Sequence, residues 1–136
     1  MGPQKQLTAY LKEVRDEPFR WGVHDCLTFT NEAWRRMYGH GWGDDLLGRY
    51  MRDGKPLGRD AMREEYGFNS LCELLNLRLA KVDFVPPSGA LVTTKQTRRW
   101  VTGVAMGICT GTRGAFVGDF GVVFMPLTDI ESGWVA

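Results

Sequence analysis

The sequence of 136 residues lacks three features that would place it in a specialised class of protein. No apolar run approaches the length of a membrane span, and residues 1–10 contain no signal-peptide core, so we expect neither a membrane anchor nor a secretion signal. The 17 basic and 16 acidic residues nearly cancel, which gives no electrostatic basis for binding nucleic acid or an anionic membrane. Three scattered cysteines are too few for a disulfide framework. These absences predict a protein made and folded in a cytoplasm, with reduced thiols.

The composition that remains is typical of one compact domain covering residues 1–136. Hydrophobic residues make up 43% of the chain and aromatic residues 12%, and a chain of this length buries a core without disulfides or metals.

The first part of the chain has helical periodicity, interrupted by proline and glycine. The predicted helices span residues 3–15, 25–38, 59–66 and 70–77. A glycine-rich loop over residues 39–58 joins the second helix to the third and carries Trp42 and Tyr50. These two aromatics, together with Trp100, are candidates for an exposed binding surface, and the alternative for each of them is a buried position in the core.

After Pro86-Pro87 the pattern becomes that of β-strands. Strands are predicted over residues 90–94, 102–110, 115–117, 122–125 and 134–135, with a helical turn over residues 128–131. Helices followed by antiparallel strands predict an α+β fold with the helices on one face of the sheet. Ala105, Gly107 and Cys109 form a strand face without bulk, where we expect the helix that begins at Cys26 to pack.

The turn over residues 19–26 is the most informative stretch. Asp25 is a good helix N-cap, so Cys26 lies at the positive end of a helix dipole, which favours the thiolate. Cys26 is therefore a candidate nucleophile. The alternative interpretation is that it is a small apolar residue packed beneath the turn.

Four short fragments of the sequence together resemble the NlpC-type cell-wall peptidases. They are Trp21-Gly22 after an aromatic residue, Asp25-Cys26, Gly89-Ala90-Leu91-Val92 and Gly107-Ile108-x-x-Gly111. The resemblance is greatest to the small relatives encoded by tailed bacteriophages, and it implies a papain-like fold and a place in the tail tip. It also implies that Cys26 attacks a peptide carbonyl of peptidoglycan, with a strand histidine as its base.

The sequence departs from this family at the base. The histidine position falls on Ala105, and no histidine follows His40. His24 precedes the N-cap, so its ring is a candidate substitute if it folds back over Cys26, but the favoured interpretation is that it packs beside Trp21 or bonds a backbone carbonyl. His40, in the loop, is a weaker candidate.

A metal site is a further possibility that the spacing does not favour. The available ligand types are His24, Cys26, His40, Asp44 and Asp45. They form no paired Cys-x-x-Cys or His-x-x-x-His motif, so we expect no metal and no other cofactor.

Three functional hypotheses follow. The first is a catalytically impaired, structural protein of the phage tail tip, a pseudoenzyme with site residues Trp21, Asp25, Trp42 and Ala105. It would reside in the virion tail and contact tail hub or distal tail proteins. Peptidoglycan would be a further partner. The second is an active thiol peptidase or amidase that cleaves cell-wall peptides with Cys26. The third is an α+β binding domain unrelated to phage tails. Asp25 and Asp119 have default roles in capping and turn formation.

Overall fold

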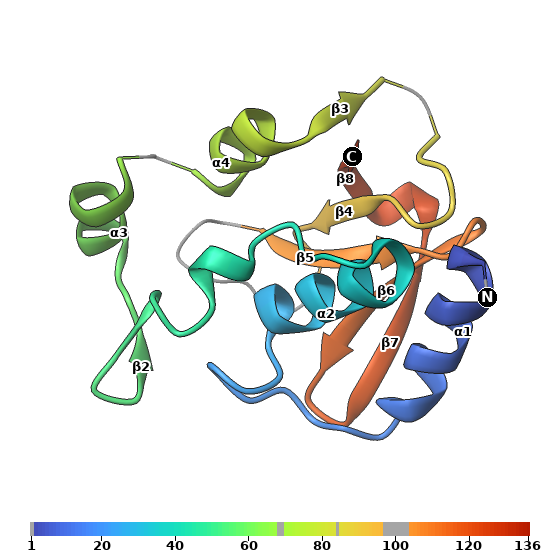
Figure 1. Ribbon diagram of the computed structural model, residues 1–136, viewed down its shortest axis with the longest axis horizontal. Helices are drawn as coiled ribbons and strands as arrows, with labels where there is room; N and C mark the ends of the chain where they lie inside the picture. Colours follow the sequence, from blue (N-terminus) through green and yellow to red (C-terminus); the bar gives the residue numbers. More distant parts are fainter. Residues whose placement is uncertain (1, 68–69, 84, 97–103) are drawn as a thin grey trace.

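The computed structural model describes residues 2–67, 70–83, 85–96 and 104–136 (Figure 1). The chain is α+β, with helices in its N-terminal part and an antiparallel sheet in its C-terminal part, as the sequence predicted. The α-helices are α1 (Pro3–Glu13), α2 (Cys26–Tyr38), α3 (Arg59–Tyr66) and α4 (Leu71–Arg78). Two short 3₁₀ helices are η1 (Asp44–Leu46) and η2 (Leu127–Asp129). Within the described ranges no helix has the length and apolar character that crossing a bilayer requires.

Local signals account for the helix boundaries. Pro3 occupies the first turn of α1, where its missing N–H costs nothing. α2 begins after Asp25 and ends at Gly39, which adopts the left-handed conformation with φ of 87°. α4 begins after Ser70, whose side chain accepts the Glu73 backbone N–H at 3.1 Å.

The main sheet has six strands in the order β3-β8-β4-β5-β6-β7, and every neighbouring pair is antiparallel. The strands are β3 (Ala80–Val82), β4 (Leu91–Thr94), β5 (Ala105–Cys109), β6 (Arg113–Gly118), β7 (Gly121–Pro126) and β8 (Ile130–Val135). A two-stranded hairpin of β1 (Met51–Arg52) and β2 (Lys55–Pro56) lies within the region predicted as loop. Asp53 and Gly54 both have positive φ, so Asp-Gly makes the tight hairpin turn that the sequence analysis missed.

α1 and α2 pack against each other and cover one face of the sheet (Figure 1). Their apolar residues share a core cluster with Met106 and Ile108 of β5. The expectation that α2 packs on the Ala105, Gly107 and Cys109 face was therefore wrong. A Cβ on Gly107 would lie 2.4 Å from the Ala115 carbonyl oxygen and within 2.7 Å of the Phe116 ring, so the missing side chain makes room for that ring and not for a helix.

The aromatics of the glycine-rich loop are also buried. Trp42 is 6% exposed and Tyr50 is 2% exposed, which corrects the expectation of an open binding surface. The Trp42 indole N–H donates to Thr30 Oγ1 at 3.0 Å, so the loop is fastened to α2. Trp100, the third aromatic of that expectation, lies outside the described residues.

Candidate functional site

The N-terminus of α2 is closed by a capping box. Asp25 Oδ1 accepts the backbone N–H groups of Leu27 at 3.0 Å and Thr28 at 2.9 Å. In return, Thr28 Oγ1 accepts the Asp25 backbone N–H at 2.7 Å. Asp25 is 0% exposed, and the predicted capping role is what the structure has.

The second carboxylate oxygen of Asp25 connects the helix to distant parts of the chain. Oδ2 accepts the Gly22 backbone N–H at 2.7 Å and the hydroxyl of Tyr50. Burial, and then the charge of Asp25, raise the pKa of the Tyr50 phenol well above its usual value, so Tyr50 remains a donor. From the sequence Tyr50 was expected only as an exposed aromatic of the loop, because a bond between residues 25 positions apart leaves no local pattern.

Cys26 lies at the start of α2 but is sealed from solvent, with 5% of its surface exposed. Burial, and then the charge of Asp25, raise the pKa of the Cys26 thiol to about 12. Hydrogen bonding from the backbone N–H of Met106 acts in the opposite direction and brings the sulfur against β5. Desolvation thus outweighs the helix dipole, and the thiol is protonated at neutral pH, whereas the sequence predicted a favoured thiolate.

Apolar side chains form the β5 surface on the side of α2. Met106 and Ile108, together with Val104 just before the strand, belong to the same core cluster as Cys26. Because side chains alternate along a strand, Ala105 and Gly107 belong to the opposite face of the sheet from Met106 and Ile108. Ala105 is buried and pairs with Thr94. Ala105, which occupies the motif position of the histidine, is thus next to Met106 in sequence. The Ala105 side chain, however, points away from the Cys26 thiol.

His24 lies on the α1 side of the turn. Its ring meets Phe29 edge-on, with centroids 5.9 Å apart, and its Nδ1 lies 3.5 Å from Glu17 Oε2. Burial lowers the pKa of His24, and Glu17 opposes that shift. The His24 ring thus contacts Phe29 and Glu17, and the His24 backbone bonds that of Arg20. His40 is exposed just beyond α2, about 20 Å along the helix from Cys26.

The other two predicted binding residues have structural contacts. Trp21 packs edge-on against Phe19, with ring centroids 5.0 Å apart. Trp42 donates to Thr30 Oγ1, and Thr30 in turn donates to the Cys26 carbonyl oxygen at 2.7 Å. The structure therefore brings together Asp25, Cys26, Tyr50 and Trp42, whereas Ala105 belongs to the opposite face of the sheet and the His24 ring contacts Phe29 and Glu17.

The acidic residues considered as metal ligands are engaged elsewhere. Asp44 accepts from Asn31 at 2.8 Å, and this bond holds the pKa of its carboxyl below the usual value. Asp45 forms a two-pronged ion pair with Arg78 at 2.7 and 2.8 Å, which lowers the pKa of Asp45. Across the described part of the chain, no three His, Cys, Asp or Glu residues are grouped so as to hold a metal ion.

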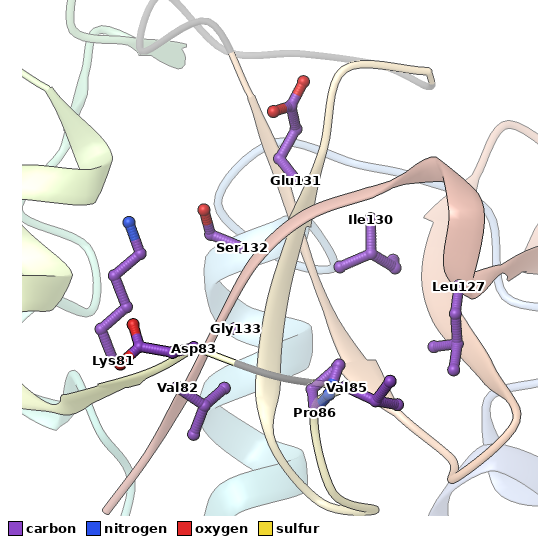
Figure 2. Close-up of a pocket in the computed structure, with 10 residues that line it drawn as sticks. All are labelled: Lys81, Val82, Asp83, Val85, Pro86, Leu127, Ile130, Glu131, Ser132 and Gly133. Atoms are coloured by element: carbon purple, nitrogen blue, oxygen red, sulfur yellow. The ribbon is translucent and has the colours of Figure 1, made fainter.

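A hollow of about 380 Å³ lies on β8, away from this site (Figure 2). Figure 2 shows polar side chains, including Lys81 and Glu131, toward one end and apolar ones, including Val85 and Leu127, toward the other. None of the predicted site residues is among the described residues that line this hollow.

Comparison with known sequences identifies the family to which the chain belongs. No curated protein matches the sequence. A family model matches residues 2–136, nearly the whole sequence. The chain therefore belongs to the family described as "Domain of unknown function (DUF6950)".

Proposed function

We propose that this protein is a papain-like, NlpC-type scaffold without peptidase activity that serves as a structural component of a bacteriophage tail tip. One observation carries the proposal: the cysteine that opens α2 against β5 has no imidazole beside it and is held as a buried thiol. A peptidase of this kind needs both an accessible thiolate and a base within hydrogen-bond reach.

The arrangement of elements supports the papain-like part of the proposal. The resemblance implies a helix with cysteine at its start, packed on a strand of an antiparallel sheet. α2 packs on β5, and the backbone N–H of Met106 in that strand acts to lower the pKa of the Cys26 thiol, against the effect of burial.

The state of the thiol supports the loss of activity. Because burial raises the pKa of Cys26 to about 12, the thiol is protonated at pH 7 and little thiolate is present to act as a nucleophile. The absence of a base costs a further factor of about 10² to 10⁴ in rate. The 5% exposure of Cys26 also leaves no room for a peptide carbonyl to approach the sulfur.

The structural role and the location in the virion tail rest on the resemblance to the tail-associated relatives. In this proposal the partners are tail hub or distal tail proteins, and the loop over residues 39–58 is a rigid wall, because Trp42 and Tyr50 fasten it to the start of α2.

Peptidoglycan digestion tests the loss of activity. The purified protein, its Cys26→Ala variant and a matched Cys72→Ala control are incubated with peptidoglycan, and soluble stem peptides are measured by mass spectrometry. All three should release the same background amount. Release by the parent and the Cys72 variant, but not by the Cys26 variant, would show an active thiol peptidase and overturn the proposal.

Genetics tests the structural role. The gene should lie among tape-measure and tail-hub genes, and the protein should be found by mass spectrometry in purified particles. Deleting the gene should stop tail assembly, and the Cys26→Ala allele should restore it. A deletion that leaves tails complete and infectious would contradict a structural role.

A further inference from the structure

A groove of about 280 Å³ runs between α1 and the edge strand β7. Leu7 and Leu11 of α1 form one wall, and Val122 and Phe124 of β7 form the other. Figure 1 shows α1 beside β7 at the margin of the sheet. The groove is therefore apolar at its floor and open along one side of the molecule.

The backbone of β7 leaves hydrogen-bonding groups available along this groove. β7 is the last strand of the sheet and pairs only with β6 in the described structure. Its Val122 N–H points outward and donates to the Arg15 carbonyl at 2.9 Å. Strand alternation directs the N–H and C=O of Phe124 to the same side, where α1 has diverged and no described backbone group bonds them.

The contact that closes one end of the groove is very tight. A Cβ on Gly121 would lie 2.2 Å from the Arg15 carbonyl oxygen, so the chain after α1 is clamped to the start of β7. The two elements separate from there toward Phe124, whose side chain is 46% exposed. An added strand would cover this half-exposed aromatic side chain and would bond the backbone N–H and C=O groups at the edge of β7.

The rim of the groove is positive. Lys12 and Arg15 line it, the other lining residues are uncharged, and no acidic residue is among them. The ion pair of Arg15 is with its neighbour Asp16 at 3.6 Å, and both side chains are largely exposed, so this pair holds Arg15 weakly. A ligand that carries a carboxylate is therefore favoured.

We propose that this groove binds an extended, acidic segment of a partner protein, which adds a strand to the edge of β7. One apolar side chain of the segment enters between α1 and β7, and its carboxylates meet Lys12 and Arg15. The inference goes beyond the proposed function and does not depend on it, because none of the residues around Cys26 lines the groove.

The charges also distinguish this occupant from a second copy of the chain. Two β7 edges brought together antiparallel would oppose the basic rims of both copies, since Lys12 and Arg15 lie beside the same strand in each. Like charges across an interface reduce association, whereas an acidic strand removes that penalty.

The test uses fluorescein-labelled nine-residue peptides that alternate leucine or valine with glutamate, and a matched set with lysine in place of glutamate. Binding to the ¹⁵N-labelled full chain is followed by fluorescence anisotropy and amide chemical shifts. The glutamate peptides should bind at least tenfold more tightly than the lysine set. Shifts should concentrate on α1 and β7, and hydrogen exchange of the Phe124 amide should slow.

Two variants make the result specific. Lys12→Glu combined with Arg15→Glu should weaken binding of the glutamate peptides about tenfold. Lys5→Glu, an exposed change on α1 outside the groove, should leave it unchanged. Three results would overturn the proposal: no saturable binding below about 1 mM, shifts centred elsewhere, or the same shifts produced by raising the protein concentration alone, which would identify a second copy as the occupant.

Discussion

Removing the Asp25 carboxylate should destabilise the protein strongly, because this buried side chain accepts hydrogen bonds from the Leu27, Thr28 and Gly22 backbone N–H groups and from the Tyr50 hydroxyl. In Asp25→Ala the helix loses its N-cap, worth about 1 kcal/mol. The Gly22 N–H and the Tyr50 hydroxyl lose their acceptor as well, and each buried donor left unsatisfied costs about 1.5 kcal/mol. The free energy of unfolding should therefore fall by about 4 kcal/mol.

Two conservative substitutions separate the contributions of the individual hydrogen bonds to this loss of stability. Asp25→Asn retains an oxygen for the Leu27 and Thr28 N–H groups, and the Tyr50 hydroxyl can rotate to accept from the new amide, so Gly22 alone loses its partner. We expect a cost of about 2 kcal/mol. Tyr50→Phe removes one donor to the charged oxygen and should also cost about 2 kcal/mol. The double variant should cost less than the sum, because in Asp25→Asn the Tyr50 hydroxyl bonds a neutral amide, and losing that weaker bond costs less than losing the bond to the charged carboxylate.

Urea unfolding followed by tryptophan fluorescence measures these differences, since Trp34 and Trp134 are buried in the folded protein. Asp25→Asn should also lower the pKa of Cys26, because the charge of Asp25 contributes to its rise after burial. The reasoning fails if Asp25→Asn costs as much as Asp25→Ala, or if the effects of Asp25→Asn and Tyr50→Phe are additive.

Three further predictions concern the thiol, the buried histidine and the sheet. At pH 8, iodoacetamide should label the half-buried Cys72 at least about tenfold faster than Cys26 in the native protein, as read by peptide mass spectrometry; equal rates would contradict a sealed thiol. Because burial lowers the pKa of His24 below 6.5, the unfolded chain binds a proton near pH 6 that the folded protein excludes, so stability should fall as the pH drops through that range. His24→Gln should flatten the dependence, and an unchanged slope in urea titrations would refute the assignment. Gly107→Ala should cost about 3 kcal/mol by urea unfolding, because the new methyl meets the Ala115 carbonyl oxygen; near-parent stability would argue against this packing.

Much of the fold follows from local patterns along the chain. The α2 boundaries are explained by Asp25 and Gly39, whose capping bonds and backbone conformation involve neighbours within four residues. The strands β4 to β7 follow the alternation and turn residues of the C-terminal part. The hairpin at Asp53-Gly54 had a readable signal too, but the many glycines of residues 39–58 obscured it.

The state of the candidate site depends on contacts between segments far apart in the sequence. The position of Cys26 at a helix N-terminus predicts a thiolate, but the core that closes over it makes the desolvation cost larger than the helix field. No local pattern announces the bond of Tyr50 to Asp25, and one step of strand alternation decides whether Ala105 or Met106 faces α2. Capping and periodicity act over a few residues and can be read from the chain. Burial, side-chain partners and the facing side of a strand are properties of the packed molecule, because they depend on which distant segments exclude water from each group.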